Sequence, residues 1–134
     1  MLKLTRTDYE AIRRHGEETY PNECCGILLG RFEEDGSRVV TSTARCGNTR
    51  TDSAHNRYNI DPKELVRIQR EGRDRGEDIV GFYHSHPDHP AHWIGCSYVI
   101  TSVEKGKAGL TNSFELTGTD ENDKRLRDEI VSVA

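Results

Sequence analysis

The sequence predicts an α/β (α+β) fold, in which strands mix with two or three helices around one hydrophobic core. The chain has 134 residues, which is enough for one domain with a core, so we expect a single domain over residues 1–134. Three short segments are continuously apolar, as is typical of strands in the middle of a sheet. These segments, residues 25–29, 79–84 and 97–103, are expected to be neighbouring buried strands.

The first half of the chain carries signals for a helix and for a pair of strands. Thr7-Asp8-Tyr9-Glu10 has the form of a capping box and predicts a helix that ends at Pro21. After the strand at residues 25–29, the turn-forming run at residues 33–36 predicts a hairpin. The β-branched residues 38–44 are therefore expected to form the returning strand.

A second helix is indicated by the residues at its start. After a brief strand over residues 57–60, Asp61-Pro62-Lys63-Glu64 places an N-cap, a first-turn proline and a capping glutamate in order. Gly76 is expected to end this helix. Three apolar side chains of the helix are expected to face inward: Leu65, Val66 and Ile68.

The end of the chain is expected to contain one more strand and a third helix. Residues 105–107 predict a turn, and residues 110–116 a last strand. Over residues 121–133 apolar residues recur at helical spacing, which predicts a C-terminal helix packed on the body of the domain. These residues are Leu126, Ile130 and Val133.

Composition excludes several classes of function. The net charge of −4 gives no electrostatic basis for binding nucleic acid. No apolar run is long enough to span a membrane, and polar residues follow Met1–Arg6 where a signal peptide would be apolar, so we expect a soluble, cytoplasmic protein. The cysteines lack zinc-ribbon spacing and are expected to be buried thiols, with two adjacent ones on opposite faces of a strand. They are Cys24, Cys25, Cys46 and Cys96.

Two histidines at the end of an expected strand are candidate metal ligands. His84 and His86 are two residues apart, a spacing that puts both imidazoles on one face of a strand while Ser85 faces away. A His-x-His pair taken alone is more often a pair of exposed surface residues than a metal site. Glu23 could be a charged residue at the start of a strand, or a general base for a water activated by a metal.

Several separated motifs resemble the JAMM (MPN) metalloproteases in order and spacing. Residues 22–30 (Asn-Glu-Cys-Cys-Gly-Ile-Leu-Leu-Gly) resemble the strand that carries the catalytic glutamate of that family. Residues 81–91, which begin Gly-Phe-Tyr-His-Ser-His-Pro, resemble its histidine pair. The resemblance is to the short bacterial members and covers roughly residues 1–116. Further segments that match them are residues 48–50, 58–62 and 97–103.

The resemblance implies a curved, mostly antiparallel sheet flanked by helices, with Zn²⁺ on His84 and His86 and Glu23 as the base. It also implies hydrolysis of an amide or isopeptide bond at the C-terminus of a ubiquitin-like or sulfur-carrier protein. The alternative is a catalytically impaired MPN domain that acts as a protein-binding module. Stoichiometric zinc that survives dialysis would favour the enzyme. The oligomeric state and the individual substrate stay open.

The active-site loop is shorter than in the family. Counted from His86, the family's serine and its zinc-binding aspartate fall on Ile94 and Ser97, so the Ser-x-x-Asp part of the motif is absent and we expect weak activity. Trp93 and Tyr98 could line a substrate groove, but are favoured as core anchors. The third zinc ligand stays open, and its candidates are His92, His89, Asp88 and Cys96.

Overall fold

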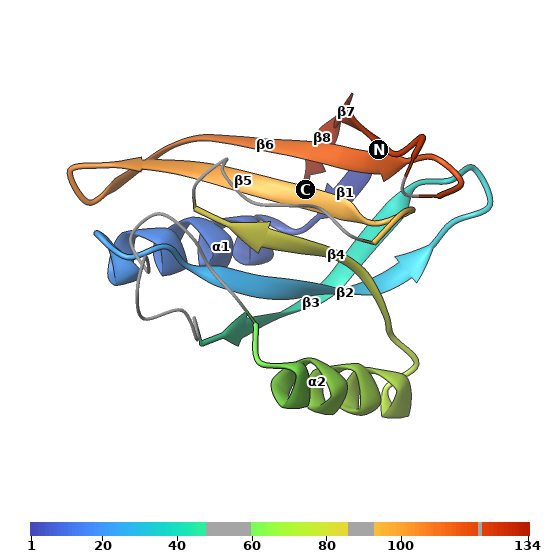
Figure 1. The fold of residues 1–134 in the computed structure, drawn as a ribbon. Helices are drawn as coiled ribbons and strands as arrows, with labels where there is room; N and C mark the ends of the chain where they lie inside the picture. Colours follow the sequence, from blue (N-terminus) through green and yellow to red (C-terminus); the bar gives the residue numbers. More distant parts are fainter. Residues whose placement is uncertain (48–59, 86–92, 121) are drawn as a thin grey trace.

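The computed structural model describes residues 1–47, 60–85, 93–120 and 122–134. Within them, one mixed sheet of eight strands runs in the order β7-β6-β5-β4-β2-β3-β1-β8, with two helices (Figure 1). The elements are β1 (Leu2–Leu4), α1 (Arg6–Thr19), β2 (Cys25–Phe32), β3 (Arg38–Cys46), α2 (Pro62–Asp74), β4 (Asp78–His84), β5 (Ser97–Glu104), β6 (Lys107–Thr117), β7 (Arg125–Glu129) and β8 (Val131–Val133).

The three apolar segments form the centre of the sheet, as predicted. β2 pairs with β4 in antiparallel orientation, and β4 pairs with β5 in parallel orientation. Residues 25–30 and 79–85 are buried throughout, because both faces of these strands are covered. The register places His84 opposite Cys25 on one side and opposite Ile100 on the other.

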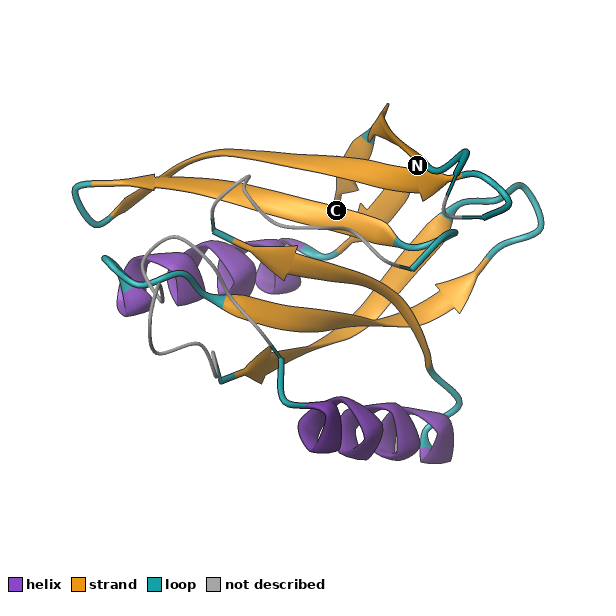
Figure 2. Cartoon of the chain, viewed as in Figure 1, coloured by secondary structure: helices purple, strands orange, loops and turns teal. Residues whose placement is uncertain are grey.

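The two helices cover opposite faces of the central strands (Figure 2). Successive side chains of a strand point to opposite faces, so neighbouring residues enter different cores. Cys25 packs in the cluster that contains Ile68 of α2, whereas Cys24 packs in the cluster that contains Ile12 of α1. All four cysteines are buried free thiols, and the expected division of Cys24 and Cys25 between two faces is confirmed.

The helix boundaries agree with the sequence signals for α2 and differ for α1. Asp61 caps α2 through the amide of Lys63, as expected, although Val66 is 50% exposed and does not face inward. For α1 the N-cap is Thr5, whose hydroxyl accepts from the amide of Asp8, so the expected start at Thr7 is wrong. The helix starts earlier because strand β1, which the sequence did not reveal, ends at Leu4.

The expected C-terminal helix is wrong, because this segment forms β7 and β8. β7 pairs with β6, and β8 pairs in parallel with β1, so both find strand partners that local spacing cannot reveal. The helical spacing of Leu126 and Ile130 does not mark a buried face, since these side chains are 50% and 70% exposed. The brief strand expected at residues 57–60 lies mostly outside the described residues.

A single residue joins the two edges of the sheet. β7 and β8 stand at opposite ends of the strand order, yet only Ile130 separates them along the chain. The amide of Leu2 donates to the Ile130 carbonyl at 2.8 Å, which fixes this corner to β1. The sheet is therefore strongly curved, and consecutive residues close it.

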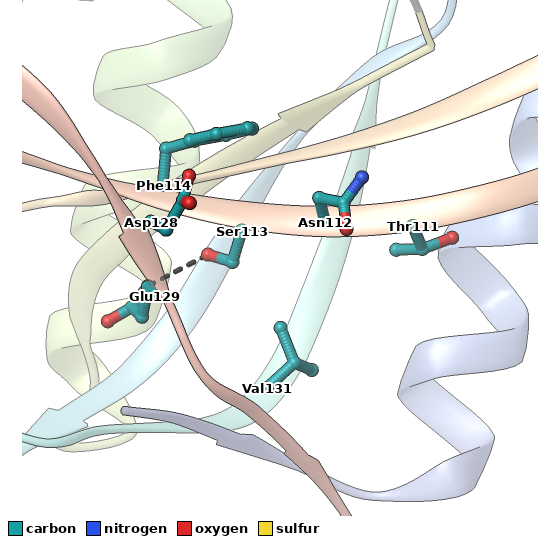
Figure 3. A pocket seen from close by; sticks show the side chains of 7 residues that line it. All are labelled: Thr111, Asn112, Ser113, Phe114, Asp128, Glu129 and Val131. Carbon is teal, nitrogen blue, oxygen red and sulfur yellow. Dashed lines mark hydrogen bonds between the residues drawn. The ribbon is translucent and has the colours of Figure 1, made fainter.

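A buried charge cluster lies beneath this corner. Glu129 of β7, with its side chain 1% exposed, accepts from the hydroxyls of Ser97 and Ser113 and from the Arg38 guanidinium. Arg38 also contacts Glu115 at 3.1 Å. Figure 3 shows Glu129 and Ser113 lining an open pocket of about 430 Å³ formed by β6, β7 and β8.

No helix in the described part of the chain is both long and apolar enough to cross a membrane.

Candidate active site

Glu23 and His84 meet where β2 and β4 lie side by side. Glu23 stands two residues before Cys25, the first residue of β2, and His84 is the last residue of β4. Because Cys25 and His84 are cross-strand partners, the two candidate side chains are brought to the same end of the sheet. Oε1 of Glu23 lies 3.3 Å from Nδ1 of His84.

Both side chains are almost completely enclosed. The Glu23 side chain is 0% exposed and that of His84 is 2% exposed. Burying an ionised carboxylate in the protein interior is unfavourable unless nearby charges or hydrogen bonds compensate it. A buried carboxylate therefore more often marks a functional site than a contribution to stability. A buried carboxylate beside a buried imidazole is an arrangement typical of an acid–base or metal site.

The imidazole of His84 is a donor that zinc binds, and the Glu23 carboxylate beside it is a candidate base for a zinc-activated water. The described residues contain no group of three or more His, Cys, Asp or Glu side chains that could hold a metal ion. They supply one of the two histidines, and the second, His86, lies outside them. A zinc site at His84 would need ligands in addition to those that the described residues supply.

Of the candidates for a third ligand, three lie outside the described residues: His89, His92 and Asp88. The fourth, Cys96, is far from His84 and is not a ligand there. Its thiol lies 4.0 Å from the carbonyl of Ile79, five residues before His84 on β4, which corresponds to roughly 16 Å along a strand. Burial raises the pKa of the Cys96 thiol to about 11, which also disfavours the thiolate that zinc binds.

The positions that correspond to the family's serine and aspartate do not serve this site. Ser97 pairs with Gly81, three residues before His84 on β4, and its hydroxyl donates to Glu129 at 2.7 Å. Ile94 is 38% exposed. Neither residue therefore supplies an anionic ligand or a donor beside His84.

Trp93 and Tyr98 are core anchors, as favoured by the sequence. The backbone amide of Trp93 donates to the Tyr98 hydroxyl at 2.8 Å, and both rings contact Phe82. Apolar surface beside the site is found instead on β5 and β6. There an open pocket of about 380 Å³ runs from Ser85 past Ile100.

A buried Tyr–His pair lies on the face of the sheet that α1 covers. The Tyr83 ring fills the space over Gly26, where a Cβ atom would lie 2.1 Å from it. The Tyr83 hydroxyl lies 2.7 Å from Nδ1 of His15 on α1. Burial is the main reason that the pKa of His15 is lowered to about 4, and the nearby Arg45 guanidinium lowers it further. Glu18 raises this pKa, but by less.

The free energy of unfolding is expected to fall on acidification because of His15. In the unfolded chain His15 takes up a proton near its ordinary pKa of 6.5, whereas in the folded protein it stays neutral down to about pH 4. Stability is therefore lost as the pH falls through this window. Urea titrations from pH 7 to pH 4 should show a weaker pH dependence for His15→Gln than for the wild type. Equal dependence in the two proteins would show that His15 is not the group responsible.

Sequence reasoning missed the structural part played by Ser85, which faces away from the candidate ligands. Its hydroxyl oxygen accepts a hydrogen bond of 2.9 Å from the backbone amide of Cys24, and the residue is 1% exposed. The alternation along the strand indicated its direction, but nothing local indicated its partner.

Comparisons with known proteins show the family to which the chain belongs. A family model described as prokaryotic homologs of the JAB domain matches residues 5–113. The chain belongs to this JAB family. A relative from Haloferax volcanii named desampylase is 33% identical over 131 residues, which cover 87% of this chain and 88% of the relative.

Solved structures of similar proteins share the fold. A solution structure from Desulfitobacterium hafniense aligns with a TM-score of 0.74 and 27% identity, covering 100% of this chain and 94% of the other. One from Salinibacter ruber aligns with a TM-score of 0.71 and 31% identity, covering 98% and 91%. The JAB-family fold expected from the motifs is thus confirmed. The sheet is curved and flanked by helices, and four of the seven strand pairings among the described residues are antiparallel.

Proposed function

We propose that the chain is a zinc-dependent hydrolase that cleaves amide or isopeptide bonds at the C-terminus of a ubiquitin-like or sulfur-carrier protein. The observation that carries the proposal is the meeting of buried Glu23 with buried His84 at the ends of two paired strands. Membership of the JAB family and the relative named desampylase support the hydrolase class.

In this proposal each residue has a separate role. His84 and His86 hold the metal. Zinc, when bound, would supply a Lewis acid and bring the pKa of a water molecule close to about 7. Glu23 would take a proton from the attacking water and pass it to the leaving amine. Enclosure of Glu23 and His84 strengthens the electrostatic interactions between them.

A second candidate function is a protein-binding module with little or no catalysis. The placement of Ile94 and Ser97 favours it, because neither residue replaces the absent aspartate and serine beside His84. Loss of a donor to the developing oxyanion lowers the rate by about 10²–10³ in a comparable hydrolase. We therefore expect turnover well below that of a relative with the complete motif.

Zinc removal should separate the two functions. After dialysis the wild-type chain is expected to retain one zinc ion and to cleave an amide-linked ubiquitin-like substrate. A chelator should stop cleavage and added zinc should restore it. His84→Gln should lose both zinc and activity, because only one imidazole of the pair remains. His15→Gln is the matched control, since it replaces another buried histidine outside the site.

Two outcomes would contradict the enzymatic proposal. A chain that holds no zinc and cleaves nothing would support the binding module. Cleavage that survives the chelator, or that is unchanged in His84→Gln, would show that the metal site has been assigned to the wrong residues.

A further inference from the structure

We propose that Ser85 is a positioning residue, whose hydroxyl sets the separation between Glu23 and His84 by binding the backbone of Cys24. This inference rests on the proposed function for its catalytic consequence. Its structural basis is the hydrogen bond from the Cys24 amide to Oγ of Ser85, at 2.9 Å between two buried residues.

The Ser85 hydroxyl takes the place of a backbone acceptor just beyond the point where β2 and β4 stop pairing. The β2–β4 ladder ends at the pair Cys25–His84, so the next amide outward, that of Cys24, has no partner from that ladder. Ser85, the next residue of the other strand, provides a side-chain oxygen in place of a carbonyl. One hydrogen bond thereby extends the pairing of the two strands by one residue.

This bond joins the two backbone segments that carry the functional groups. Cys24 directly follows Glu23, and Ser85 directly follows His84. Any change in the distance between these segments therefore moves the carboxylate relative to the imidazole. Because Ser85 points to the opposite face of the strand, it acts on the pair through the backbone and does not touch the reacting groups.

Helix α1 encloses the bond on its outer side. A Cβ atom placed on Gly16 would lie 3.6 Å from the Ser85 Cβ and 3.9 Å from the Cys24 thiol. The helix thus approaches the bond closely. In such a site a hydrogen bond is strong and an unsatisfied amide is unfavourable, so the bond holds a fixed geometry.

Three variants test the inference. Ser85→Ala removes the acceptor without adding volume, and Ser85→Thr restores it. Ser113→Ala is the matched control, since it removes another buried hydroxyl, bonded to Glu129 and outside the catalytic machinery. Melting temperatures of all three variants distinguish loss of folding from loss of positioning.

In the zinc-loaded protein, the effect should appear in kcat. Ser85→Ala is expected to lower kcat roughly 10- to 100-fold, because small misplacements of reacting groups are costly, with KM changed by less than about threefold. Ser85→Thr and Ser113→Ala should each stay within about threefold of the wild-type kcat. A Ser85→Ala variant with wild-type kcat would overturn the inference.

A second measurement on the metal-free protein is independent of activity. In NMR spectra, Ser85→Ala should speed exchange of the Cys24 amide and shift the imidazole nitrogen signals of His84, whereas Ser113→Ala should change neither. If the wild type cleaves no substrate, the proposed function fails, and these spectra alone decide the role of Ser85. Unchanged His84 signals in Ser85→Ala would overturn it.

Discussion

Glu23→Gln is expected to lower kcat by about 10²–10⁴-fold, which is the range that a positioned general base contributes. Glutamine keeps the size and most contacts of the side chain but cannot accept the proton. Zinc affinity should change little if the ion is held by His84 and His86. Steady-state kinetics together with a zinc titration therefore separate loss of the base from loss of the metal.

The control for this variant is Glu18→Gln. Glu18 lies at the end of α1 and pairs with Arg45 at the surface, so its replacement should leave kcat unchanged. Melting temperatures of the metal-free proteins check that both variants are folded. Wild-type turnover by Glu23→Gln would remove Glu23 from the mechanism.

Arg38→Met is expected to destabilise the protein by about 3–5 kcal/mol, the typical cost of breaking a buried ion pair from one side. The Arg38 guanidinium contacts Glu129 at 2.7 Å, and its Nε donates to the carbonyl of Gly95. Methionine would leave the enclosed Glu129 carboxylate without its closest cation. Urea denaturation monitored by circular dichroism measures the loss.

The matched control is Arg67→Met on α2. Arg67 makes an exposed pair with Glu71 four residues later, a type of contact that contributes about 0.3–0.5 kcal/mol. The double variant Arg38→Met/Glu129→Gln should recover part of the lost stability, because it removes the buried carboxylate that has lost its guanidinium partner. Equal losses for Arg38→Met and Arg67→Met would mean that the buried cluster is not a stabilising unit.

The elements that sequence reasoning located correctly have local signals. The central strands are continuously apolar, and α2 is preceded by Asp61 and followed by Gly76, whose φ of +77° is unfavourable for other residues. The C-terminal segment lacks such signals. Its apolar residues fit a helix by spacing, and only the presence of β6 and β1 as partners makes it two strands.

The same distinction holds for the candidate site. Glu23 and His84 could be singled out because each stands in a motif with a recognisable neighbourhood. The hydrogen bond between Ser85 and Cys24 could not be predicted from the sequence, since it joins residues 61 positions apart. The burial of Arg38 was equally hidden, because an arginine at the start of a strand is ordinarily exposed, and its partners come from distant strands.

The parallel pairing of β1 with β8 has a mechanical consequence. The two strands lie side by side with residue 1 at the start of one and residue 134 at the end of the other. A force that pulls these two residues apart would slide β1 past β8 and load their hydrogen bonds together, in shear, instead of opening them one after another. Two further hydrogen bonds would share that load: the Arg6 amide donates to the Ala134 carbonyl, and the Ala134 amide donates to the Leu4 carbonyl. The domain should therefore resist a force applied between these two residues more strongly than its thermodynamic stability alone suggests, because forced unfolding is governed by the height of the barrier.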